Sequence, residues 1–185
     1  TRDRVERRAH RKCSSGYNLA GLLREREAGR RIAALVAGSA GTLGIVVGAT
    51  FAGRRAPVGR AAVLLSFADL AGACRLVPAL RAGAAAVEIM NARSVALVRS
   101  RFPEAGLPGG DGHLLLVELA GDGATERARA VAAAAVRSGE RLVAPPEVAE
   151  AEDRIGGLWM ARKLMLPLLR AREGRYRALA VVNDV

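Results

Sequence analysis

The segment from residue 38 to residue 44 combines three glycines with two hydroxyl side chains: Gly38, Ser39, Gly41, Thr42 and Gly44. Glycine has no Cβ atom, so the backbone N–H groups of such a loop can approach a flat or polyanionic ligand closely, and the hydroxyls add hydrogen-bond donors. This composition suits a cofactor cradle. A Gly-rich turn between a helix and a strand has the same spacing, so the motif alone leaves both interpretations open.

A second group of residues lies near the end of the chain, where Trp159, Arg162 and Leu166 share one face of a predicted helix at spacings i, i+3 and i+7. The guanidinium of Arg162 is a planar fork that binds a carboxylate through two hydrogen bonds. The spacing therefore predicts a carboxylate-binding position. The alternative is that Trp159 is a core residue and that Arg162 and Lys163 form a solvated basic turn.

The cysteines and histidines form no metal or redox motif. Cys13 and Cys74 lack CxxC spacing, and His10 and His113 have no partner at ligand spacing. We expect no metal site, and a structural role for His113. Unpaired cysteines fit a reducing compartment and residues 1–18 contain no apolar segment of the signal-peptide type, so we expect a cytoplasmic location.

The charge balance is strongly basic, with 29 Lys and Arg against 18 Asp and Glu, a net charge of +11. Such a balance favours nucleic-acid binding when the basic residues cluster. Here the arginines are spread along the chain, only Lys12 and Lys163 are lysines, and aromatic residues make up 3%. We therefore expect no nucleic-acid partner.

Residues 32–51 carry no charge and lie between two arginine pairs, which meets the length rule for a transmembrane helix. Glycines through the middle of this stretch favour a turn between two short elements instead. We expect no membrane span. A small membrane-anchored protein that uses residues 32–51 remains an alternative interpretation.

The apolar patterns predict two regions that meet near residue 57. Before it we expect a helix over residues 30–37 and a strand over 44–51. After it the patterns predict strands over 61–67, 85–90, 113–119, 140–144 and 178–182, and helices over 69–81, 94–101, 122–137 and 155–172. Asp69 and Asp122 are the expected N-caps, and Pro78 and Pro167 are expected to bend or shorten their helices. The order predicts an α+β fold, a ferredoxin-like sandwich with helices on one face of an antiparallel sheet.

Three segments resemble, in order, the FAD-linked oxidases, the family that includes D-lactate dehydrogenases, D-2-hydroxyglutarate dehydrogenases and the flavin subunit of glycolate oxidase. The first is residues 11–19, RKCSSGYNL, and the second is residues 38–46, GSAGTLGIV. The third is residues 158–163, LWMARK, together with residues 183–185, NDV. This last segment is similar to the branch of the family that is fused to an iron–sulfur domain.

The resemblance implies FAD as the cofactor. It also implies that residues 1–56 are the end of an FAD-binding domain of the PCMH (VAO) type, and residues 57–185 a truncated FAD-linked oxidase C-terminal domain, the substrate cap. The cofactor-binding residues it implies are Lys12, Gly16, Tyr17, Gly38, Ser39, Gly41, Thr42, Gly44 and Ile45.

The implied activity is oxidation of a 2-hydroxy acid of the D-lactate, glycolate or 2-hydroxyglutarate type by hydride transfer to the flavin. Arg162 would anchor the substrate carboxylate and Lys163 would assist it. An iron–sulfur domain or subunit would accept the electrons. The expected location is cytoplasmic, including a peripheral position at the inner face of the membrane.

The chain also departs from the family pattern. Ala40 replaces an acidic residue, Val47 and Gly48 replace a Thr-Glu pair, and Asn183 replaces a glutamate. The loop that holds the FAD pyrophosphate and the downstream histidines of the family have no counterpart here, so the chain resembles an internal fragment that we expect to be inactive alone. A non-enzymatic ferredoxin-like binding module, formed from residue 57 onward, is the alternative from another class.

Overall fold

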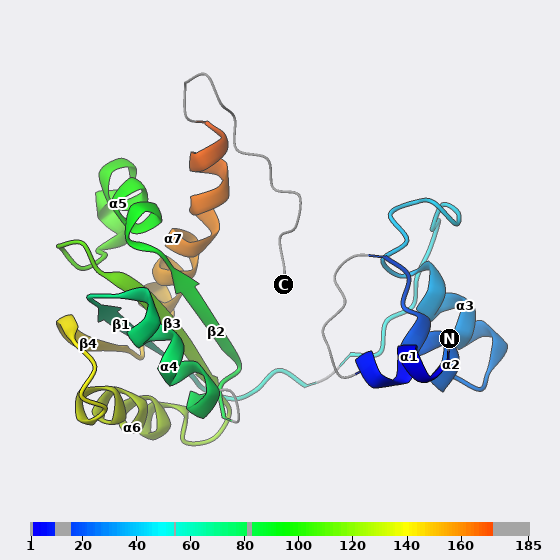
Figure 1. The fold of residues 1–185 in the computed structure, drawn as a ribbon, viewed down its shortest axis with the longest axis horizontal. Helices are drawn as coiled ribbons and strands as arrows, with labels where there is room; N and C mark the ends of the chain where they lie inside the picture. Colours follow the sequence, from blue (N-terminus) through cyan, green and yellow to red (C-terminus); the bar gives the residue numbers. More distant parts are fainter. Residues whose placement is uncertain (1, 10–15, 54, 81–82, 172–185) are drawn as a thin grey trace. The chain divides into compact units, whose positions relative to one another are not determined.

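The structure is a computed structural model that describes residues 2–9, 16–53, 55–80 and 83–171. The chain divides into two compact units, with the division between residues 54 and 55. Figure 1 draws both units. The predicted strand over residues 178–182, Lys12 and residues 183–185 lie outside the described residues.

The described part of the first unit contains three helices, α1 (Arg2–Arg8), α2 (Leu19–Arg24) and α3 (Ala28–Val36). Asn18 caps α2, because its side-chain oxygen accepts a hydrogen bond from the Gly21 N–H at 2.8 Å. Helix α3 confirms the helix predicted over residues 30–37. A loop follows that contains the glycine motif.

The strand predicted over residues 44–51 is wrong, because the described backbone forms no strand there. A strand needs a neighbouring strand to satisfy its N–H and C=O groups, and the described part of this unit offers only helices and loops. The β-branched side chains therefore lie in solvent, with Ile45 90% and Val47 98% exposed.

The second unit is built on a four-stranded antiparallel sheet in the order β2-β3-β1-β4. The strands are β1 (Arg60–Phe67), β2 (Ala86–Met90), β3 (His113–Ala120) and β4 (Leu142–Ala149). The helices are α4 (Leu70–Leu80), α5 (Ala92–Arg101), α6 (Ala124–Arg137) and α7 (Glu152–Arg170), with a 3-10 turn, η1 (Pro103–Ala105), after α5. Without α5 and α7 the order is β-α-β-β-α-β, so the α+β prediction is confirmed.

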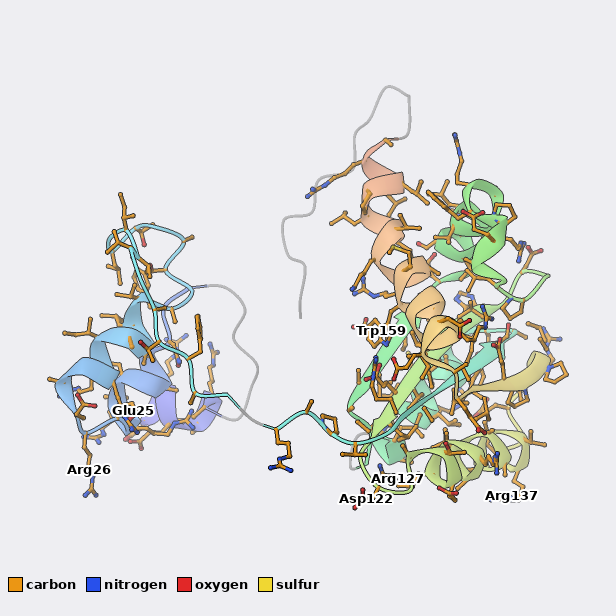
Figure 2. The ribbon with its side chains drawn as sticks, turned by 180° about the vertical axis from the view of Figure 1, so that it is seen from behind. Glu25, Arg26, Asp122, Arg127, Arg137 and Trp159 are labelled. Atoms are coloured by element: carbon orange, nitrogen blue, oxygen red, sulfur yellow. The ribbon has the colours of Figure 1, made fainter. Side chains whose placement is uncertain are left out.

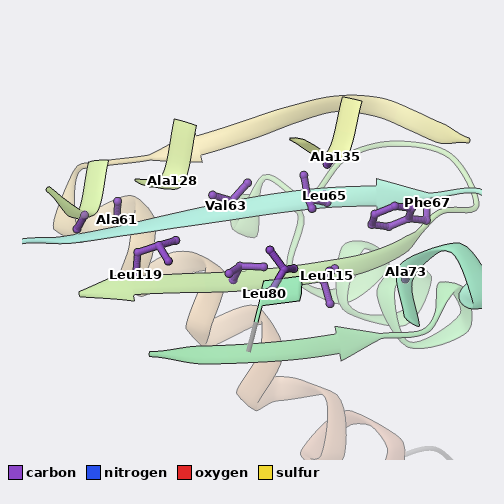
Figure 3. Packing of buried hydrophobic residues seen from close by; sticks show 12 residues of the cluster. Ala61, Val63, Leu65, Phe67, Ala73, Leu80, Leu115, Leu119, Ala128 and Ala135 are labelled. Carbon is purple, nitrogen blue, oxygen red and sulfur yellow. The ribbon is translucent and has the colours of Figure 1, made fainter. Parts of the chain in front are cut away.

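Helices cover both faces of this sheet, which corrects the expectation that they lie on one face. On one face Val63, Leu65 and Phe67 of β1 belong to a core cluster with residues of α4 and α6 (Figure 3). On the other face Ala62 and Leu64 belong to a second cluster with residues of α5 and α7. Strand β1 is buried from residue 61 to residue 67, and its apolar run over residues 61–65 is typical of a strand covered on both sides.

Strand β4 is longer than predicted and runs through Pro145 and Pro146. Proline removes a backbone donor, so within sheets it is confined to edge strands and bulges. Both conditions hold among the described residues, because there β4 pairs only with β1 and the register shifts between Leu64 and Ser66, next to the prolines. The strand predicted over residues 140–144 ends before these prolines.

Four helix termini refine the predictions. The Asp69 side chain accepts a hydrogen bond from the Gly72 N–H at 2.7 Å, as expected of a cap. The predicted cap Asp122 is wrong, because α6 begins after Gly123, whose φ of 67° suits glycine. Pro78 and Pro167 lie inside α4 and α7, and each helix ends within three residues of its proline.

Candidate functional site

The first two sequence motifs meet in the first unit. The Tyr17 hydroxyl lies 3.0 Å from Thr42 Oγ1, although the two residues are 25 positions apart. Thr42 Oγ1 donates its own hydrogen to the Ser39 carbonyl at 2.6 Å, so the tyrosine is the donor in their contact. A Cβ atom built on Gly38 would lie 3.7 Å from the Gly16 carbonyl oxygen, which places the two glycine segments side by side.

Backbone conformation shapes the loop. Gly38 and Gly41 have φ angles of 87° and 80°, in the left-handed region that glycine alone enters without strain. Ala40, between them, has φ of 51° and carries the steric penalty of an L-residue there. A Cβ on Gly41 would meet nothing within 4 Å, so this side of the loop is open.

The predicted cofactor residues therefore differ in what they can offer a ligand. Ser39 is 5% exposed, so its side chain does not face solvent, and the Thr42 hydroxyl is already bonded within the loop. Gly41, Gly44 and Ile45 are exposed. The ligand surface of this loop is thus its backbone and the apolar side chain of Ile45, not its hydroxyls.

In the second unit, Trp159 and Glu118 connect α7 to the sheet. The indole Nε1–H of Trp159 donates to Glu118 Oε2 at 2.5 Å, and Figure 2 shows the ring projecting from α7. The Glu118 side chain is 13% exposed and also accepts from Arg60, whose Nε and Nη2 lie 3.2 and 2.9 Å from its two oxygens. The hydrogen bond to Glu118 raises the pKa of Arg60 above its ordinary value. This carboxylate is fully engaged.

Arg162 lies one helical turn beyond Trp159, beside the sheet. Its Nε–H donates to Glu88 Oε2 of β2 at 2.9 Å, and both side chains are about one third exposed, at 33% and 32%. The sequence predicted an open guanidinium, whereas the structure gives it this partner. Lys163 is exposed and makes no hydrogen bond to a described residue, so the structure does not bring it into the Glu88–Arg162 contact.

Three arginines lie on the face of the sheet that α7 covers, and they differ in how many donors are used. Arg60 uses Nε, Nη1 and Nη2, since Nη1 also bonds Glu152 at 2.8 Å. Arg154 likewise uses all three nitrogens, on Glu147 and on two carbonyls near η1. The hydrogen bond to Glu147 raises the pKa of Arg154.

Arg162 is different from these two arginines. Among the described residues, only its Nε has a hydrogen-bond partner. Its two terminal nitrogens, which form the outer edge of the fork, have none there. Of these three arginines, Arg162 is the one that has donors left for a ligand among the described residues.

Sequence reasoning missed Glu88, Glu118 and Arg60. A signal was present, because Glu88 and Glu118 are single carboxylates inside otherwise apolar strands. A carboxylate in such a position requires a charged or hydrogen-bonding partner. The partner itself could not be read from local spacing, since Arg162 is 74 residues from Glu88.

Other candidate features have structural roles or are absent from the described residues. His113 Nδ1 accepts a hydrogen bond from the Ala92 N–H at 3.4 Å, at the start of α5. No group of three or more His, Cys, Asp or Glu side chains suited to a metal occurs among the residues that the structure describes. Within the same residues, no helix has both the length and the apolar character needed to cross a bilayer.

The fold and the site define an α+β domain in which a helix bearing an arginine fork packs on a sheet that supplies the carboxylates. The chain belongs to the family of FAD linked oxidases, through their C-terminal domain, whose pattern matches residues 56–185. A search of curated proteins found no match. The cofactor of this family is FAD, and the chain is accordingly part of an FAD-dependent oxidoreductase.

The glycine loop fits this cofactor in its donor chemistry. Its left-handed glycines and open backbone can approach a phosphate or a flat ring closely, and the exposed Ile45 offers apolar contact. Tyr17 and Thr42 fix the shape of the loop through their hydrogen bond.

Proposed function

We propose that this chain serves an FAD-dependent dehydrogenase that oxidises a small 2-hydroxy acid of the D-lactate, glycolate or 2-hydroxyglutarate type. The observation that carries the proposal is the Arg162 fork, whose outer edge has no partner among the described residues although its Nε is held by Glu88. A carboxylate accepts two parallel hydrogen bonds from such an edge. The match of residues 56–185 to the FAD linked oxidases supplies the redox context.

In this proposal the two units divide the work. Residues 1–56 are the end of the flavin-binding domain, of the PCMH type, and hold FAD through the backbone of residues 38–45. Residues 57–185 are the substrate cap. When bound, FAD accepts the hydride from the substrate carbon, and the protein supplies binding and orientation.

Arg162 orients the substrate by its carboxylate. Two charge-assisted hydrogen bonds fix both the position and the plane of that group, which favours one presentation of the neighbouring carbon. Lys163, exposed on the next residue, adds positive potential and attracts the anion. Lys12, which lies outside the described residues, would serve the cofactor side.

The proposed function also implies an electron acceptor and a location in the cell. An iron–sulfur domain or subunit is the proposed electron acceptor, on the resemblance of residues 158–163 to that branch. We propose no nucleic-acid partner, since the arginines are dispersed. A cytoplasmic location, including a peripheral position at the inner face of the membrane, fits this assignment.

A non-enzymatic binding module is the second candidate. The observation in its favour is that Trp159 and Arg162 both bond carboxylates of the sheet, as residues with a purely structural role would. The two candidates differ in one respect. Only the dehydrogenase needs Arg162 for binding a 2-hydroxy acid.

The test is to titrate the chain with glycolate, D-lactate and D-2-hydroxyglutarate by calorimetry, beside the variants Arg162→Ala and Arg129→Ala. Arg129 is the matched control, because it pairs with Glu150 at 2.7 Å on another part of the surface. We expect binding of at least one acid, reduced about ten-fold or more by Arg162→Ala and unchanged by Arg129→Ala. Equal binding by both variants would favour the non-enzymatic module.

A further inference from the structure

We propose that Glu88 is a positioning residue that orients the Arg162 fork toward the substrate carboxylate. This inference rests on the proposed function, and it adds a residue that neither the sequence motifs nor the family match assigns. It starts from the contact between Arg162 Nε and Glu88 Oε2 at 2.9 Å.

The strand register places Glu88 beneath α7. Glu88 is paired with Leu116 of β3, and both Leu116 and Met90 belong to the core cluster that α5 and α7 cover. Side chains two residues apart on a strand share a face, so Glu88 faces the same helix as Met90. Its position is fixed by the sheet and not by a flexible loop.

A comparison with Glu118 shows that Glu88 has a dedicated partner. Both carboxylates lie on this face, and they bond Trp159 and Arg162, three residues apart on α7. Glu118 is also neutralised by Arg60 through two hydrogen bonds. Among the described residues, Glu88 bonds Arg162 alone.

The bond through Nε has a consequence for ligand binding. An arginine side chain loses much of its rotamer freedom when it is fixed, and a ligand that orders it must offset that loss. Glu88 orders the side chain beforehand and takes the inner nitrogen, which leaves the Nη1–Nη2 edge for two parallel bonds. Such pre-organisation raises affinity without a new contact to the ligand.

Glu88 also repels the ligand carboxylate, so an alanine variant alone would mix two opposing effects. Glu88→Gln removes the charge and keeps an oxygen that can accept the Nε–H, whereas Glu88→Ala removes both. The repulsion is absent from both variants. Their ratio of affinities therefore isolates the positioning effect.

The experiment measures glycolate affinity of the full chain by calorimetry, with the fluorescence of Trp159, its single tryptophan, as a second signal one helical turn away. We expect Glu88→Ala to bind glycolate about 5- to 10-fold more weakly than Glu88→Gln. In an Arg162→Ala background the two Glu88 variants should bind equally. A purely structural role of Glu88 would give the same ratio in both backgrounds, and that result would overturn the proposal.

The other outcomes separate this inference from the proposed function. If Arg162→Ala abolishes binding while Glu88→Ala and Glu88→Gln bind equally, the positioning role fails and the carboxylate anchor stands. If Arg162→Ala binds glycolate as tightly as the unchanged chain, both fail. Should Glu88→Ala not fold, Glu88→Leu takes its place, since its side chain carries neither a charge nor an acceptor for the Nε–H, and it too must bind more weakly than Glu88→Gln.

Discussion

The glycine loop of the first unit and the α7 face of the second unit hold their candidate residues in different ways. The loop is shaped by backbone conformation and a Tyr17–Thr42 hydrogen bond, and the segment that follows it is almost fully exposed. The α7 face is fixed by buried strands and by carboxylates that bond Trp159 and Arg162.

This difference matches the two ligands proposed for them. A small acid offers few contacts, so its site gains most from side chains that are already ordered on rigid elements. A large cofactor covers much more surface, and a loop can be ordered by the contacts that it makes on binding. The following predictions test this contrast.

The largest effect is expected from Leu158→Ala, because Leu158 is fully buried where α7 packs on the sheet. We expect the free energy of unfolding of the second unit to fall by about 3–4 kcal/mol, from lost burial and a residual cavity. Denaturant unfolding measures this. Met160→Ala, at an exposed position two residues away, is the control and should change it by less than about 0.5 kcal/mol. Equal effects would mean that α7 is not held as the structure shows.

Arg162→Ala should have the next largest effect, on turnover rather than on folding. In the complete enzyme, loss of two charge-assisted bonds should cost roughly 2–4 kcal/mol, or about 30- to 1000-fold in kcat/KM, for a 2-hydroxy acid. Flavin content should stay unchanged, because the glycine loop belongs to the other unit. Arg162→Lys should recover only part of the loss, since an ammonium lacks the fork. Near-normal kcat/KM in the alanine variant would mean that Arg162 has a structural role and does not bind the substrate.

The sequence predicted the elements of the second unit well where apolar runs are bounded by turn residues. Strands β1, β2 and β3 each lie within one residue of their predicted bounds. The second helical layer was missed, although the apolar run over residues 61–65 of β1 carried the signal. The strand predicted over residues 140–144 is shorter than β4, whose prolines are tolerated through its edge position, and that position is a property of the whole sheet.

The candidate site could be predicted only in part, for a related reason. Arg162 follows from helical spacing and residue chemistry, which are local. Its orientation depends on Glu88, 74 residues away, and on the pairing of β2 with β3. The strand predicted over residues 44–51 shows the opposite case, in which the local pattern is right for a strand but the described unit supplies no partner for it.

A smaller effect is expected in the glycine loop from Thr42→Val, which removes the hydroxyl that bonds both Tyr17 and the Ser39 carbonyl. Both contacts lie near the surface, so we expect the free energy of opening the loop to fall by about 1 kcal/mol. Amide hydrogen exchange of residues 38–44 measures this. Thr42→Ser keeps the hydroxyl and should behave as the unchanged chain. Exchange that is equally fast in the unchanged chain and in Thr42→Val would show that these bonds do not order the loop.

The smallest expected effect is a pH dependence of the stability of the second unit. The hydrogen bond from Arg75 lowers the pKa of Glu140 below its ordinary value, and Nη2 of Arg75 lies 2.6 Å from Glu140 Oε2. A carboxyl whose pKa is lowered by folding binds fewer protons in the folded state than in the unfolded state. Its contribution to stability is therefore present above the ordinary pKa of a glutamate, about 4.3, and disappears as the pH falls through the lower pKa of the folded state.

Arg75→Ala tests this, because it removes the cause of the shift while leaving Glu140 in place. The pair is solvent-exposed on the arginine side, so the difference in Tm from the unchanged chain should be small at about pH 7. That difference should shrink further as the pH falls through the lowered pKa of Glu140, below which Glu140 is protonated in both proteins. A Tm difference that stays constant from about pH 7 to about pH 3 would show that Arg75 stabilises α4 by packing of its aliphatic stem and not by its charge.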